Sequence, residues 1–210
     1  MYDSSSFELI RSAVLAHADP QPSHRVVDLG AGSGFLTLAF APRVADVLAV
    51  DISPAMLELL ARQADEQGLT GIRCLATDLA ALALSEASVD VIVSSYALHH
   101  LVDGEKRALV ERAGSWLKPG GRLVVADMMF GRGQTAHDRA IIRQKVLALM
   151  RKGPGGMWRI LKNLVRFGLR RGTELPAPPA FWLETLERAG FHDVHYQPIV
   201  SEAGLVVGVR

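Results

Sequence analysis

Cysteine and long apolar runs are both scarce in this 210-residue sequence. Because Cys74 is the one cysteine, the chain can form neither an internal disulfide nor a thiolate zinc cluster. No stretch approaches the roughly 18 consecutive apolar residues of a membrane-spanning helix, and the first 20 residues lack the basic and apolar parts of a secretion signal. We therefore expect a cytoplasmic protein that is stabilised by a hydrophobic core.

Acidic residues are nearly missing from one segment, between Phe130 and Gly172. This segment holds eleven Lys or Arg residues and one acid, Asp138, which gives it a net charge of +10. The rest of the chain holds 12 basic and 21 acidic residues, for a net charge of −9. The basic charge therefore forms a single block, and we expect this block to have a role of its own.

Outside the basic block, short apolar runs alternate with helical patterns. The runs that predict strands are 25–30, 47–52, 72–78, 89–95 and 122–128. The patterns that predict helices are 8–18, 35–42, 53–68, 104–120 and 179–191. Nearly continuous Val, Ile and Leu runs between helices are typical of a parallel sheet that is covered on both faces.

The ends of these elements carry recognisable signals. Ser53 followed by Pro54 predicts a helix N-cap, and "LKPGG" at 117–121 predicts the end of a helix before the fifth strand. Residues 193–200 and 204–210 predict an antiparallel hairpin joined by the turn "SEAG". We expect one α/β domain over 1–210, a doubly wound, mostly parallel seven-stranded sheet with this C-terminal hairpin, and a helical lid inserted at about 130–174 after the fifth strand.

The stretch "VVDLGAGSGFLTLAF" at 26–40 predicts a strand, a glycine turn and a helix, which is where an open parallel sheet binds a nucleotide. Gly30, Gly32 and Gly34 permit a tight turn and close approach of the backbone to a ligand. The nicotinamide fingerprint would place a glycine at position 35, where this chain has Phe35. A phosphate-binding P-loop would need a Lys followed by Ser or Thr after the glycines, whereas Gly34 is followed by Phe35 and Leu36.

Two acids beside this turn suggest the nature of the ligand. Asp28 precedes Gly30 by two positions, where its charge would repel a pyrophosphate but could bind an ammonium group. Asp51 ends the second strand, 21 positions after Gly30, where a carboxylate can accept both hydroxyls of a ribose. A nucleoside that carries a cationic group would satisfy both acids.

Five motifs in sequence order now resemble the class I S-adenosylmethionine-dependent methyltransferases of the small-molecule type. They are "VVDLGAGSG", "VLAVDISPAMLE", "IRCLATD", "VDVIVSSYALHHL" and "WLKPGGRLVVADM", from about residue 25 to residue 128. The resemblance implies that S-adenosylmethionine is bound and leaves as S-adenosylhomocysteine. It also implies the cofactor-binding residues: Asp28, Gly30, Ala31 and Gly32 for the methionine part, Asp51 for the ribose, Ile52, Met56, Asp78 and Leu79 for the adenine, and Ser94 and Ser95 near the ammonium and the methyl group.

His99 and His100 follow the fourth predicted strand, at the rim of the expected acceptor pocket. Either could act as a general base, because histidine titrates near neutral pH, and we favour His100 slightly. Alternatively, the pair closes the loop through hydrogen bonds to the backbone. Some quinone-type methyltransferases have metal-binding acids near this loop, but Tyr96 and His99 stand at the comparable positions, so we expect no metal. Tyr96 either stacks on an aromatic acceptor or has an ordinary packing role, and Tyr2 and Phe7 could fold over the cofactor.

Residues 157–171 in the basic block predict an amphipathic helix. One side of it gathers the polar residues Arg159, Lys162, Asn163, Arg166 and Arg170. Three interpretations stay open: a pocket lid with solvated cations, a surface helix on anionic membrane, and attraction to an acidic partner such as RNA. We do not expect nucleic acid, because exposed aromatic residues do not alternate with the cations. Glycines at 153–156 predict a hinge before the helix.

We expect transfer of a methyl group by in-line displacement to an O, N or C atom of a small, apolar acceptor, such as a natural product, quinone or lipid. An alternative is a membrane- or RNA-associated accessory protein that binds the cofactor without methyl transfer. The acceptor, the atom methylated and the oligomeric state do not follow from the sequence, because specificity resides where the resemblance is loosest.

Overall fold

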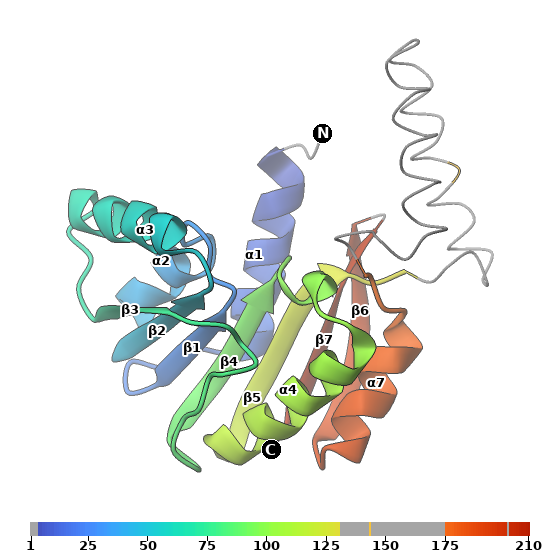
Figure 1. The fold of residues 1–210 in the computed structure, drawn as a ribbon. Coiled ribbons are helices and arrows are strands. Elements are labelled where there is room, and N and C mark those ends of the chain that lie inside the picture. The colour runs from blue at the N-terminus through green and yellow to red at the C-terminus, as the bar shows by residue number, and fades with distance from the viewer. Residues whose placement is uncertain (1–3, 131–142, 144–174, 201) are drawn as a thin grey trace.

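The computed structural model describes residues 4–130, 143, 175–200 and 202–210. These residues form a seven-stranded sheet in the order β3-β2-β1-β4-β5-β7-β6, with helices on both faces (Figure 1). The strands are β1 (Arg25–Leu29), β2 (Asp46–Asp51), β3 (Ile72–Ala76), β4 (Val89–Ser95), β5 (Leu117–Met128), β6 (His192–Val200) and β7 (Ala203–Val209). The expected doubly wound sheet with its C-terminal hairpin is confirmed.

The strand pairing determines where a ligand can bind. Strands β3, β2, β1, β4 and β5 are parallel, and β7 is antiparallel to both β5 and β6. The order reverses between β1 and β4, where Asp28 pairs with Val93. In an open α/β sheet this reversal leaves a crevice at the carboxyl ends of the strands. The glycine turn after β1 lies at that edge.

Two sets of helices cover the sheet. They are α1 (Ser4–Ala18), α2 (Thr37–Phe40), η1 (Ala41–Arg43), α3 (Pro54–Glu66), η2 (Leu98–His100), α4 (Asp103–Trp116) and α7 (Pro179–Arg188). Ile10 of α1 and Phe40 of α2 pack in one buried cluster with the sheet, whereas Trp116 of α4 and Trp182 of α7 pack in another. Side chains alternate along β1, so Val26 belongs to the first cluster and Val27 to the second.

Helix α3 begins as its sequence predicts, because the Ser53 side chain accepts a hydrogen bond from the Met56 N–H at 3.4 Å. Several boundaries differ from expectation. Helix α1 begins at Ser4, four residues before the predicted start. Helix α4 ends at Trp116, and Leu117 already pairs with Val89, so "LKPGG" lies within the bounds of β5. The helix predicted at 35–42 is confined to α2 and the short η1. Strand β7 begins at Ala203, so the hairpin turn is shorter than predicted.

The lid predicted at about 130–174 and the basic helix predicted at 157–171 lie outside the described residues, apart from Phe130 and Arg143. Both remain predictions. In the part of the chain that the structure describes, no helix has the length and apolar character needed to cross a bilayer.

Candidate active site

The glycine turn after β1 is tied to β2. The N–H groups of Gly30 and Ala31 both donate to the Val50 carbonyl oxygen, at 2.8 and 2.9 Å. Gly30 and Gly32 have φ values of +73° and +54°, in the left-handed region that favours glycine. A Cβ on Gly30 would lie 2.2 Å from the Ala97 Cβ, whereas one on Gly32 would meet nothing within 4 Å. Gly30 is therefore needed for packing, and Gly32 borders open space.

Asp51 joins this turn to the start of α3. Its Oδ2 accepts a hydrogen bond from the Gly32 N–H and its Oδ1 accepts one from the Ser53 N–H, both at 2.8 Å. A carboxylate oxygen can accept a second hydrogen bond, so both oxygens retain capacity for ribose hydroxyls. The neighbouring apolar side chains of Ile52 and Met56 are exposed by 70% and 46%. Such exposed apolar side chains suit the faces of an adenine ring.

Asp28 is buried at the end of β1, and its partner is Thr37. The Asp28 Oδ2 accepts hydrogen bonds from the Thr37 N–H at 3.0 Å and the Thr37 hydroxyl at 2.6 Å. Burial raises the pKa of Asp28 to about 6, because the hydrogen bonds from Thr37 offset the loss of hydration only in part and the Asp51 charge adds to the rise. A cation bound nearby would stabilise the ionised carboxylate.

The two serines that end β4 differ in their contacts. The Ser94 hydroxyl is buried and donates to the Leu29 carbonyl oxygen at 2.7 Å, which fixes the end of β1. The Ser95 hydroxyl oxygen is also buried but has no hydrogen-bond partner among the described residues. A buried polar group without a partner is costly, so its presence at the expected site favours a polar ligand group there. Together with the open space at Gly32, Ser95 fits the methionine part of the expected cofactor.

Asp78 and Leu79, expected at the adenine edge, begin the connection from β3 to β4. Asp78 is exposed and its Oδ1 accepts a hydrogen bond from the Ala80 N–H at 2.8 Å. The Leu79 carbonyl oxygen accepts a hydrogen bond from the Arg112 Nη2 at 2.9 Å. Arg112 is a site neighbour that the sequence analysis did not identify.

His99 forms a buried pair with Asp127, which precedes the last residue of β5. The His99 Nδ1 lies 2.6 Å from the Asp127 Oδ1, and the His99 N–H donates to Oδ2 at 2.9 Å. The Met128 N–H also donates to Oδ1, at 2.7 Å. His100, by contrast, is exposed, with its ring centre 4.1 Å from that of His99. The sequence analysis missed Asp127, although the parallel pairing of β4 with β5 is what brings it to His99.

A fully buried lysine supports the backbone beside His99. The His99 carbonyl oxygen accepts a hydrogen bond from the Leu175 N–H at 2.6 Å. The Lys106 Nζ donates to the Leu175 carbonyl oxygen at 2.6 Å and to the Asp103 Oδ1 at 3.2 Å. Leu175 therefore links the His99 backbone to Lys106 of α4.

Aromatic side chains gather beside the end of β4. The Phe7 ring centre lies 5.6 Å from that of Phe35 and 6.1 Å from that of Tyr96. Tyr96 has a φ of +50°, a left-handed conformation that is uncommon for a tyrosine. Burial raises the pKa of Tyr96 to about 12, and the nearby Asp127 charge adds to the rise. The phenol therefore stays neutral at physiological pH.

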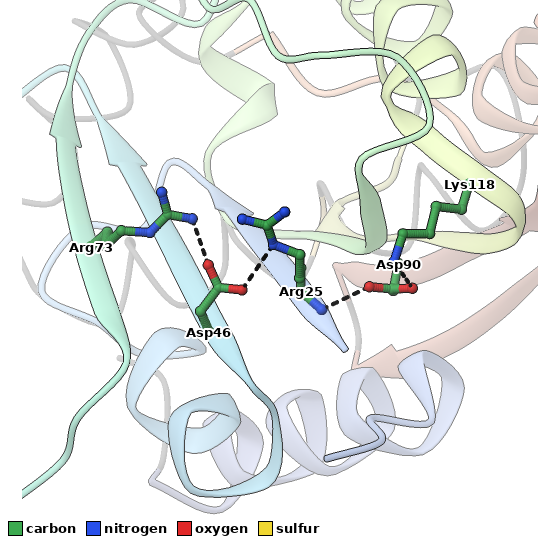
Figure 2. Close-up of polar contacts among 5 residues, drawn as sticks. All are labelled: Arg25, Asp46, Arg73, Asp90 and Lys118. Atoms are coloured by element: carbon green, nitrogen blue, oxygen red, sulfur yellow. Dashed lines mark hydrogen bonds and ion pairs between the residues drawn. The ribbon is translucent and has the colours of Figure 1, made fainter. Parts of the chain in front are cut away.

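The opposite edge of the sheet is a ladder of paired charges, shown in Figure 2. Asp46 accepts hydrogen bonds from the side chains of Arg25 and Arg73, and Asp90 accepts them from the Arg25 N–H and the Lys118 Nζ. Burial alone would raise the pKa of Asp90, but these hydrogen bonds and the Lys118 charge outweigh it and lower the pKa below its usual value. Asp90 at this edge thus shows the opposite pKa shift to Asp28.

Comparison with known proteins agrees with the geometry. Residues 26–121 match a family described as "Methyltransferase domain". The uncharacterized methyltransferase YcgJ of Bacillus subtilis is 34% identical over 110 residues, which cover 52% of this chain and 43% of that protein. The carboxy-S-adenosyl-L-methionine synthase of Geobacter sp. is 33% identical over 122 residues, 54% of this chain and 48% of that protein.

A solved structure of the YcgJ protein covers 99% of both chains with a TM-score of 0.68 and 20% identity, a likeness that concerns the fold. The chain spans about half the length of the curated relatives named above. Its motifs, its strand order and the match over residues 26–121 nevertheless agree with one another. Over residues 26–121 the chain is thus similar to S-adenosylmethionine-dependent methyltransferases, and it shares its fold with the YcgJ structure.

Proposed function

We propose that this protein transfers a methyl group from S-adenosylmethionine to an O, N or C atom of a small, apolar acceptor, and that His99 is the general base. The observation that carries this proposal is the buried 2.6 Å contact between His99 and Asp127 at the ends of β4 and β5. When bound, S-adenosylmethionine supplies a methyl group already activated by its sulfonium. The protein must therefore align the acceptor, exclude water and remove a proton.

The pairing with Asp127 determines which nitrogen of His99 can act. A carboxylate accepts hydrogen bonds and cannot donate them, so the Nδ1 proton is held toward Asp127 and the lone pair lies on Nε2. The His99 and Met128 N–H groups hold the carboxylate in place. As His99 takes the acceptor proton at Nε2, the Asp127 charge stabilises the imidazolium. His100 is exposed, whereas His99 is buried against Asp127, and this difference favours His99 over His100.

The character of the acceptor follows from the neighbouring side chains. Phe7, Phe35 and Tyr96 form an aromatic group beside the end of β4, and Phe7 remains 37% exposed. Aromatic rings favour apolar or planar ligands, which supports a natural product, quinone or lipid. A base is most useful for an acceptor that must lose a proton, so a hydroxyl group suits His99 best.

Conversion of S-adenosylmethionine to S-adenosylhomocysteine with a panel of phenols, quinols and amines tests this proposal. We expect His99→Gln and Asp127→Asn each to lower kcat/KM by about 10² to 10⁴-fold, the usual contribution of general-base catalysis. Binding of S-adenosylhomocysteine, followed by calorimetry, should change little in both variants. The exposed His192 on β6 offers a matched control, His192→Gln.

Three outcomes would contradict the proposal. Full turnover by His99→Gln would show that His99 is not the general base. A larger loss of kcat/KM in His100→Gln than in His99→Gln would assign that role to His100. Cofactor binding without turnover of any acceptor in the panel would favour the accessory protein over the enzyme.

A further inference from the structure

The connection from β3 to β4 has an unusual support. Residues 77–88, all described, contain neither helix nor strand, yet this connection covers the face of the sheet occupied by α4. Leu82 is buried in the core cluster on that face, and Leu79 and Leu84 pack against the same cluster. Most of the connection is exposed, but the backbone around the buried Leu82 has no regular structure and must find other partners for its polar groups.

Arg112 of α4 supplies these partners from one side. Its Nη1 donates to the carbonyl oxygens of Ala80 at 3.0 Å and Leu82 at 2.8 Å, and its Nη2 donates to that of Leu79 at 2.9 Å. The guanidinium carbon lies 5.5 Å from the centre of the Trp116 ring, which restricts it further. A planar guanidinium with five donors can hold three carbonyls at once, whereas an ammonium group cannot match that geometry.

Asp78 holds the same turn from the other side. Its side chain accepts a hydrogen bond from the Ala80 N–H, and its carbonyl oxygen accepts hydrogen bonds from the N–H groups of Ala81 and Leu82, at 3.0 and 3.1 Å. Within this turn, Asp78 thus holds three N–H groups, at 80–82, and Arg112 holds three carbonyl oxygens, at 79, 80 and 82. The backbone of Leu79 cannot shift without breaking its contact with Arg112.

We infer that Arg112 is a positioning residue that sets the preference of the cofactor site for a 6-aminopurine. This inference rests on the expected placement of the adenine beside Asp78 and Leu79. A 6-amino group donates hydrogen bonds to Asp78, whereas a 6-oxo group presents an acceptor to the same carboxylate and is disfavoured. Arg112 determines where these residues lie. Its removal should therefore reduce the ratio of the two binding affinities while the protein remains folded.

Calorimetric binding of S-adenosylhomocysteine and its 6-oxo analogue, S-inosylhomocysteine, tests the inference without any turnover. We expect the wild type to favour the adenosyl compound by at least about tenfold, the value of one well-placed hydrogen bond. In Arg112→Gln the adenosyl affinity should fall by about tenfold while the inosyl affinity changes little, so the ratio approaches one. The exposed Arg107 on the same helix provides the matched control, Arg107→Gln, which should keep the wild-type ratio.

Thermal unfolding of each variant without ligand separates positioning from general loss of structure. If Arg112→Gln is too unstable for calorimetry, Arg112→Lys keeps the charge and should show the same loss of ratio. A wild-type ratio in a folded Arg112 variant would overturn the inference, as would equal binding of both compounds by the wild type. Absence of any S-adenosylhomocysteine binding by the wild type would overturn the cofactor assignment as well, whereas failure of the catalytic proposal alone would leave these binding results intact.

Discussion

Alanine at Gly30 should mainly reduce stability, whereas alanine at Gly32 should mainly reduce cofactor binding. Both glycines have positive φ values in the same turn, +73° and +54°. They differ in their surroundings, because a Cβ at position 30 meets the Ala97 Cβ at 2.2 Å and a Cβ at position 32 meets nothing within 4 Å. Gly30→Ala should therefore mainly destabilise the fold, and Gly32→Ala should mainly impair binding.

The magnitudes follow from two contributions. A left-handed conformation costs an L-residue about 1–2 kcal/mol, from which the reduced entropy of the unfolded alanine chain returns about 0.4–1 kcal/mol. Gly32→Ala should thus lower the free energy of unfolding by about 1 kcal/mol. Gly30→Ala adds the clash with Ala97, for which overpacking in a core costs about 1–3 kcal/mol, so its total loss should be about 2–4 kcal/mol.

Urea unfolding of the ligand-free variants and calorimetric titration with S-adenosylhomocysteine measure the two effects separately. Gly32→Ala should bind at least about tenfold more weakly, because its methyl group enters the space expected for the cofactor. In the double variant Gly30→Ala with Ala97→Gly, the clash is absent. Its free energy of unfolding should therefore exceed the value expected from adding the effects of the two single variants, by the cost of the clash. Equal destabilisation by the two alanines, or unimpaired binding by Gly32→Ala, would refute the reasoning.

Three further changes test the charges at and around the site. The folded-state pKa of Asp28, about 6, lies above the ordinary value of 3.8 for an aspartate, so ionising Asp28 costs stability as pH rises from about 4 to 6. Asp28→Asn should remove this cost, and urea unfolding at pH 7 should show a gain of about 2–3 kcal/mol over the wild type that disappears by pH 4. Asp90 has the opposite shift, because Lys118 lowers its pKa, so Asp90→Asn should lose stability at neutral pH and match the wild type under acid conditions; an unchanged difference across pH would contradict this sign. Lys106→Met keeps the volume but removes the donor to the Leu175 carbonyl, so thermal or urea unfolding should show a loss of about 1–3 kcal/mol; a gain would mean that burying the charge costs more than its contacts return.

Much of the fold could be predicted because it depends on local patterns. An unbroken apolar run such as 91–93 is typical of a strand with both faces buried, and Ser53 before Pro54 specifies where α3 begins. The ends of helices and strands were less predictable where pairing with a distant strand determines them. Leu117 follows α4 directly but pairs with Val89, so "LKPGG" falls within β5 and not in a loop.

The site was predictable only as far as single residues in motifs. Ser94 and Ser95 are adjacent and chemically identical, yet the alternation of a strand directs one hydroxyl to Leu29 and leaves the other without a described partner. The His99–Asp127 pair joins residues 28 positions apart through the register of β4 and β5, which no local pattern contains. The contacts of Arg112 with the connection from β3 to β4 could not be predicted from the sequence for the same reason.

The two edges of the sheet show why ligand binding should stabilise this protein strongly. At the amino ends, the carboxylates of Asp46 and Asp90 are paired with cations, and the pairing favours the folded state. At the carboxyl ends, burial raises the pKa of Asp28, the Ser95 hydroxyl lacks a described partner and Ile52 exposes apolar surface. The first two features cost free energy in the ligand-free chain, and we expect a nucleoside with an ammonium group to relieve both and to cover Ile52. A ligand that binds the folded state alone adds RT ln(1 + [L]/Kd) to the free energy of unfolding. We therefore expect the cofactor to raise the stability of this protein.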